Sequence, residues 1–179
     1  MKDFSKLEKN ISVVFKNKEL LKEALTHRSY LNENPNWGQH NERMEFLGDA
    51  VLELITTEYL YQKYPKATEG ELTAFRAALI NYQMLAQVAQ EIDLEKYIFL
   101  SKGEAKDTGK ARESILANAF EALTAGIYLD QGYKIVQDFV GKFLLPHLDE
   151  IVEKQLYKDA KSLLQEIIQE KLKLTPAYK

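Results

Sequence analysis

The chain has 179 residues, a length typical of one domain or of one domain with a short tail. Hydrophobic residues make up 45% of it and charged residues 28%, which excludes a disordered chain and is typical of a globular protein. Its apolar runs are too short to cross a membrane, and no secretory signal pattern opens the sequence. The absence of cysteine excludes disulfides, thiolate-bound metals and thiol catalysis. We therefore expect a cytoplasmic protein with no membrane partner.

The net charge of −3 is unevenly distributed. Residues 154–179 carry six lysines against three acidic residues, a local charge of +3, which leaves −6 for residues 1–153. An acidic body with a basic tail predicts either a solvated tail or a body whose carboxylates bind metal cations.

Helical periodicity dominates the chain, because strand-like patterns are limited to residues 11–14 and 97–100. We predict helices, in chain order, over residues 18–26, 41–63, 72–90, 112–129, 134–145, 146–154 and 160–173. Asn41 is the expected cap of the long second helix, and Pro65 follows its end. Residues 92–102 are expected to be irregular, and residues 103–110 to form a charged loop. The sequence therefore predicts an all-α fold of about seven or eight helices.

The predicted helix over residues 41–63 is apolar on most sides and yet carries three acidic residues. Glu45, Asp49 and Glu53 follow one another at intervals of four, which turns each by only about 40° from the last on an α-helix. Like charges therefore share one face of a helix that is expected to be buried. Gly48 immediately precedes Asp49, and so small a residue allows another chain segment to approach closely.

The predicted helix over residues 112–129 has the same character, because Asn118 and Glu121 lie three residues apart and point the same way. Buried carboxylates cost several kcal/mol each when unpaired. A hard divalent cation removes that cost, and four oxygen ligands with water suit Mg²⁺ or Mn²⁺. The alternative is that each pair lies on a solvated helix face, and Glu53 in particular fits that alternative or an ion pair.

Di-metal helical bundles produce a similar pattern but require Glu-x-x-His pairs. The three histidines, His27, His40 and His147, do not stand at that spacing from the acidic residues, which disfavours a redox site of that kind.

Residues 41–52, with the sequence Asn-Glu-Arg-Met-Glu-Phe-Leu-Gly-Asp-Ala-Val-Leu, resemble the signature of bacterial ribonuclease III, an endonuclease that cleaves double-stranded RNA. The stretches 24–30, 69–77 and 112–130 resemble further motifs of the same family, so the similarity covers about residues 10–150. The resemblance implies a catalytic domain over residues 1–153, a linker over 154–158 and, in residues 159–179, the first helix of a truncated double-stranded-RNA-binding domain. The chain is then expected to be a fragment of a longer protein.

The resemblance also implies a symmetric homodimer with one metal site in each subunit. The family's four acidic positions, which hold Mg²⁺ or its substitute Mn²⁺, fall on Glu45, Asp49, Asn118 and Glu121. Asp49 and Glu121 are the expected catalytic residues. The family's supporting acidic positions fall on Glu42, Glu69 and Glu104.

Two further sets of residues follow from the resemblance. Phe46 corresponds to an aromatic residue that inserts into the partner subunit, although ordinary core packing is the other interpretation of this residue. The basic residues expected to contact RNA are Arg28, Lys102, Lys106, Lys110 and Arg112.

Asn118 departs from the family, which has Asp at this position, and the departure removes one negative charge from the ligand set. The expected activity is hydrolysis of double-stranded RNA to 5′-phosphate and 3′-hydroxyl ends, in processing of ribosomal precursor, messenger and transfer RNA. A weakened or silent double-stranded-RNA-binding relative is the alternative that Asn118 supports. An unrelated helical interaction module is a third. Retention of three acidic ligands favours the enzyme.

Overall fold

The structure, a computed structural model, describes residues 2–106 and 108–157, so the predicted helix over 160–173 lies outside the described residues. The described residues form nine α-helices and two 3₁₀ turns, with a single β-bridge between Thr26 and Phe99. The helices are α1 (Ser5–Ile11), α2 (Lys18–Ala24), α3 (Arg28–Glu33), α4 (Glu42–Lys63), α5 (Glu69–Leu79), α6 (Tyr82–Glu91), α7 (Lys110–Gln131), α8 (Tyr133–Phe143) and α9 (His147–Glu153). The 3₁₀ turns are η1 (Leu94–Lys96) and η2 (Glu104–Lys106). The all-α prediction is confirmed.

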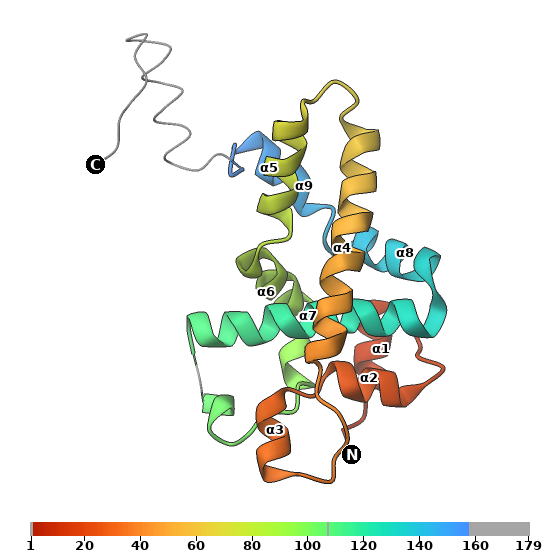
Figure 1. Ribbon diagram of the computed structural model, residues 1–179, viewed down its shortest axis with the longest axis vertical. Helices are drawn as coiled ribbons and strands as arrows, with labels where there is room; N and C mark the ends of the chain where they lie inside the picture. Colours follow the sequence, from red (N-terminus) through yellow and green to blue (C-terminus); the bar gives the residue numbers. More distant parts are fainter. Residues whose placement is uncertain (1, 107, 158–179) are drawn as a thin grey trace, which may run out of the picture.

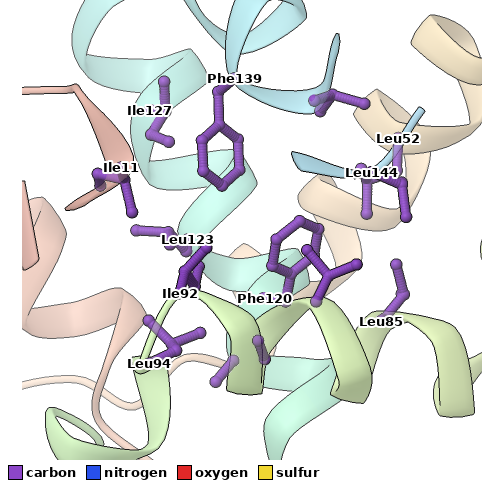
Figure 2. Close-up of a cluster of buried hydrophobic side chains, with 14 of the residues drawn as sticks. Ile11, Leu52, Leu85, Ile92, Leu94, Phe120, Leu123, Ile127, Phe139 and Leu144 are labelled. Carbon is purple, nitrogen blue, oxygen red and sulfur yellow. The ribbon is translucent and has the colours of Figure 1, made fainter. Parts of the chain in front are cut away.

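Helix α7 is the centre of the fold, with α2, α4, α6 and α8 packed around it (Figure 1). It can occupy this place because it is apolar on most sides, and its residues from Ile115 to Ile127 are almost all buried. Phe120 is fully buried, and its ring centroid lies 5.5 Å from that of Phe139 in α8. Figure 2 shows Phe120, Leu123 and Ile127 among core side chains from other helices. No helix among the described residues is both long and apolar enough to cross a membrane.

Helices α4 and α7 cross at Gly48 (Figure 1). A β-carbon on Gly48 would stand 1.8 Å from the carbonyl oxygen of Glu121, so only glycine allows the two backbones to meet here. The two helices with acidic residues are therefore held in direct contact at the position where those residues lie.

The region after α4 differs from the prediction of one helix over residues 72–90. Thr68 and Glu71 form a reciprocal capping box that starts α5 at Glu69, three residues earlier than expected. The Asn81 side chain then accepts a hydrogen bond of 2.9 Å from the Met84 amide and starts a separate helix, α6. The two capping motifs therefore divide this segment into two helices, although its apolar pattern is continuous.

The amino-terminal region contains helices that the sequence did not predict. α1 and α3 were missed, and α2 ends at Ala24 rather than residue 26 because Thr26 pairs with Phe99. Asn41 precedes α4 as expected but does not cap it with its side chain. Its Nδ2 instead donates to the Ala24 carbonyl at 3.3 Å, which ties the start of α4 to the end of α2.

Candidate active site

The crossing of α4 and α7 brings the four expected metal ligands together. The carboxylates of Asp49 and Glu45 both act electrostatically on Glu121, and the Asn118 side chain forms a hydrogen bond with Glu45. The contact between Gly48 and the Glu121 backbone places residues of both helices at one point. The carboxylates of Glu45, Asp49 and Glu121 therefore lie close enough to influence one another's charge.

The electrostatics of the cluster are those of crowded, partly buried negative charge. Burial, with the charges of Asp49 and then Glu45, raises the pKa of Glu121 to about 7. Burial also raises the pKa of Glu45, and the charges of Glu42 and Asp49 add to it, whereas the hydrogen bond from Asn118 opposes the shift. In the described ranges no lysine, arginine or histidine pairs with Glu45, Asp49 or Glu121.

The donor set fits a hard divalent cation, because it consists of oxygen ligands whose mutual repulsion a double positive charge would offset. No three acidic or histidine side chains among residues 2–106 and 108–157 form a metal-ligand group by themselves. The Asn118 amide oxygen and water would complete the coordination, which is ordinary for Mg²⁺ because this ion keeps several waters.

The expected supporting acidic residues do not all lie at the cluster. Glu42 lies beside Glu45 and forms an ion pair of 3.1 Å with Arg28. Glu104, in η2, acts electrostatically on the His27 imidazole. Glu69 begins α5, beyond the far end of α4, where its carboxylate accepts a hydrogen bond of 3.2 Å from Thr73.

The length of α4 explains the position of Glu69. This helix has 22 residues and therefore spans about 33 Å, with Glu45 in its first turn and Glu69 past its last. A single chain thus brings Glu42 to the acidic cluster and leaves Glu69 apart from it.

Phe46 does not belong to the core. Its side chain is 81% exposed, and it lines a cavity of about 740 Å³ together with Leu20, Leu47 and Leu129. Leu54 and Tyr61, also on α4, are exposed as well. Large exposed apolar side chains beside a hollow are typical of a protein interface.

The expected RNA-contacting residues separate into two groups. Arg28, Lys102, Lys106 and Lys110 are exposed. Arg112 is not on that surface, because its side chain is only 21% exposed and points to Glu95, with an N–O distance of 3.8 Å. Its Nη1 atom is buried and has no hydrogen-bond partner. The Arg112 side chain therefore lacks the exposure that the predicted RNA contact requires, because the first turn of α7 directs this residue toward η1.

Sequence reasoning missed a group of buried polar residues close to this site, namely Thr26, Ser29 and Asn41. The Asn41 amide donates to the Thr26 carbonyl, and the Ser101 amide, 72 positions away in the sequence, donates to Ser29, so no local spacing could have identified these contacts.

A family model described as Ribonuclease-III-like matches residues 17–148. The ribonuclease 3 of a Nitratiruptor species is 46% identical over 179 residues, which cover 100% of this chain and 77% of that protein. The ribonuclease 3 of Borreliella afzelii (strain PKo) is 43% identical over 175 residues, 98% of this chain and 71% of that protein.

A solved structure of the nuclease domain of ribonuclease III from Campylobacter jejuni superposes with a TM-score of 0.74 at 38% identity, covering 80% of this chain and 97% of that one. Its description refers to a flexible region involved in dimer formation of that domain. The chain belongs to the ribonuclease III family. It is a ribonuclease, an endonuclease that hydrolyses RNA.

Proposed function

We propose that this protein is a metal-dependent endonuclease of double-stranded RNA that works as a symmetric homodimer and leaves 5′-phosphate and 3′-hydroxyl ends. The observation that carries the proposal is the crossing of α4 and α7, where Glu45, Asp49 and Glu121 meet without a cationic partner from the described chain. Groups arranged in this way repel one another, so their placement in one cluster is best explained by a cation that binds them.

Glu45, Asp49, Asn118 and Glu121 would hold Mg²⁺, for which Mn²⁺ is the expected substitute. When bound, the ion lowers the pKa of a water molecule and offsets negative charge on the phosphodiester. Asp49 and Glu121 provide the two carboxylates whose removal is expected to reduce RNA cleavage most. Asn118 orients the Glu45 carboxylate through its hydrogen bond, and the Gly48 contact fixes the spacing of the two helices.

The homodimer is supported by the exposed apolar side chains on α4. Phe46, Leu54 and Tyr61 lie far outside the core, and Phe46 stands beside its own cavity. In a two-fold assembly the same surface serves both subunits, so the ring of one copy faces the cavity of the other. The dimerisation of the related Campylobacter jejuni domain points the same way.

Double-stranded RNA is the proposed substrate, in processing of ribosomal precursor, messenger and transfer RNA in the cytoplasm. Proteins recognise such duplexes by shape, through phosphates and 2′-hydroxyl groups. The exposed residues Arg28, Lys102, Lys106 and Lys110 offer the positive charge that phosphates require. Binding through them is expected to weaken as salt concentration rises.

A second candidate is a silent double-stranded-RNA-binding relative, and one observation favours it. The Asn118 amide supplies a hydrogen bond to Glu45, which satisfies part of the cluster without any metal. Three carboxylates nevertheless remain in the cluster. Their mutual repulsion destabilises the fold, and RNA binding without cleavage would not require them.

Incubation with long duplex RNA in Mg²⁺, Mn²⁺ or EDTA separates the two candidates. We expect metal-dependent shortening of the duplex, lost in Glu121→Gln and kept in the matched control Glu53→Gln, whose exposed carboxylate lies on the same helix as Glu45. A duplex that is bound but stays intact in all three conditions would establish the silent relative.

A further inference from the structure

The connection between α2 and α3 lies between two parts of the proposed site. On one side it pairs with residue 99, since the Phe99 amide donates to the Leu25 carbonyl at 2.8 Å and the His27 amide donates to the Phe99 carbonyl at 3.1 Å. On the other side the Asn41 amide donates to the Thr26 carbonyl at 2.9 Å. This connection therefore joins the start of α4 to the segment that leads into η2.

Ser29 extends this link to Glu104. The side chain of Ser29 is buried, with only 6% of the residue exposed, and its Oγ accepts a hydrogen bond of 3.1 Å from the Ser101 amide. The Ser101 Oγ in turn accepts a hydrogen bond of 3.2 Å from the Glu104 amide. Two consecutive hydrogen bonds thus connect a buried hydroxyl on α3 to the residue that carries the Glu104 carboxylate.

The direction of the hydrogen bond between Ser29 Oγ and His27 Nδ1 depends on which of the two atoms carries a proton. Ser29 Oγ lies 2.8 Å from His27 Nδ1, and because Nδ1 accepts a hydrogen bond from the Ser29 amide it carries no proton, so the hydroxyl proton of Ser29 is directed to His27. The Ser29 amide also donates to the same nitrogen, at 3.3 Å. His27 Nδ1 therefore accepts from both groups, which requires a neutral ring with its proton on Nε2.

His27 lies within electrostatic range of several charged residues near the site. Glu104, Arg28, Glu42 and His40 all act electrostatically on this imidazole. Glu42 is also next to Glu45 in the acidic cluster. The hydrogen-bonded chain from Ser101 through Ser29 thus ends at an imidazole on which acidic residues of both α4 and η2 act.

We propose that Ser29 is a positioning residue for the nuclease site, whose hydroxyl holds the segment 99–104, and with it Glu104, in register with the first turn of α4. The inference rests on the proposed function, because it assigns Glu104 to the site that cleaves RNA. Positioning groups that do not touch the ion change metal affinity or activity by about 10–100-fold when removed.

A double-mutant cycle tests this role. Ser29→Ala is expected to lower the rate constant of duplex cleavage about tenfold or more, because it loosens the segment that carries Glu104. KM for RNA is expected to change less, because the basic residues Arg28 and Lys110 lie outside that segment. In a Glu104→Ala background the same change is expected to cost little more, since the group it positions has gone. An equal loss in both backgrounds would overturn the proposal.

The control variant is Thr56→Val, which removes a buried hydroxyl from α4 that bonds only to carbonyls of its own helix. It is expected to cost stability without a specific loss of cleavage. If Ser29→Ala lowers the rate no more than Thr56→Val at equal unfolded fraction, the hydroxyl is merely structural.

Amide hydrogen exchange gives a readout that does not depend on cleavage. Ser29→Ala is expected to speed exchange at the Ser101 and Glu104 amides at least tenfold at unchanged melting temperature, and Thr56→Val is expected to leave both amides protected. Unchanged exchange in Ser29→Ala contradicts the positioning role even if the wild-type chain cuts RNA. Faster exchange in a wild-type background that fails to cut RNA would instead refute the proposed function while leaving the hydrogen-bond link standing.

Discussion

Gly48 of α4 lies directly against the backbone of Glu121 in α7, so that a β-carbon at position 48 would stand 1.8 Å from the Glu121 carbonyl oxygen. The contact involves backbone on both sides, so no side-chain rotation can relieve a clash. It also sets the distance between the carboxylates that the two helices carry.

Gly48→Ala is therefore expected to force α4 and α7 apart. We expect a loss of about 1–3 kcal/mol or more in the free energy of unfolding, measured by urea denaturation, because insertion into a packed contact costs that much. Gly141→Ala is the matched control, since nothing lies within 4 Å of a β-carbon there and alanine favours the helix by up to about 1 kcal/mol. Equal effects of the two changes would show that the contact at Gly48 is loose.

The raised pKa of Glu121, about 7, predicts how stability depends on pH without metal. A carboxyl whose pKa rises on folding stabilises the fold fully below its unfolded pKa of about 4.5, and that contribution is lost as the pH rises through the folded value. In EDTA, Glu121→Gln is expected to melt at a progressively higher temperature than wild type between pH 5 and 8. Circular dichroism melts check this, with Glu53→Gln as the control for charge removal. A temperature difference that stays constant with pH contradicts it.

Asn118→Asp restores a fourth carboxylate and predicts opposite effects with and without metal. In EDTA the melting temperature is expected to fall, because the change adds repulsion and removes the hydrogen bond to Glu45. With Mg²⁺ the melting temperature of Asn118→Asp is expected to exceed that of the wild type, and to do so already at low ion concentration. The reason is that an ion that binds the folded chain more tightly stabilises it more at a given concentration. A Mg²⁺ titration of melting temperature measures both, and Asn118→Ala separates the lost hydrogen bond from the added charge.

Phe46→Ser is expected to weaken association without unfolding the chain, because the ring is 81% exposed and the core does not contain it. Sedimentation velocity at several concentrations should show a shift toward monomer of at least tenfold in the dissociation constant, as for a central interface residue. Val14→Ser removes another exposed apolar side chain, one that does not line the cavity, and should leave association unchanged.

The elements that the sequence predicted best are the two whose apolar pattern is densest. The helices over 41–63 and 112–129 are confirmed as α4 and α7, and the shared faces of Glu45 with Asp49 and of Asn118 with Glu121 follow from helical spacing alone. Short amphipathic segments were harder. α1 and α3, of 7 and 6 residues, depend on tertiary packing rather than on their own propensity.

Contacts between distant parts of the chain set the limit of prediction. Arg112 has the charge of an RNA-binding residue, and only the fold shows that it is drawn toward Glu95. Ser29 is an ordinary serine in the sequence until Ser101 is placed beside it. Phe46 was assigned to an interface by resemblance, and its exposure agrees with that assignment.

The order of the chain has a consequence for its synthesis. Glu45 emerges from the ribosome long before Glu121, and the Thr26–Phe99 bridge likewise joins segments made far apart in time. Closing such long loops costs conformational entropy, and the formation of local helices does not offset this cost. We therefore expect the acidic side chains to come together late in folding. A nascent chain that ends before α7 carries Glu45 and Asp49 but lacks Glu121, so it cannot yet assemble the acidic cluster.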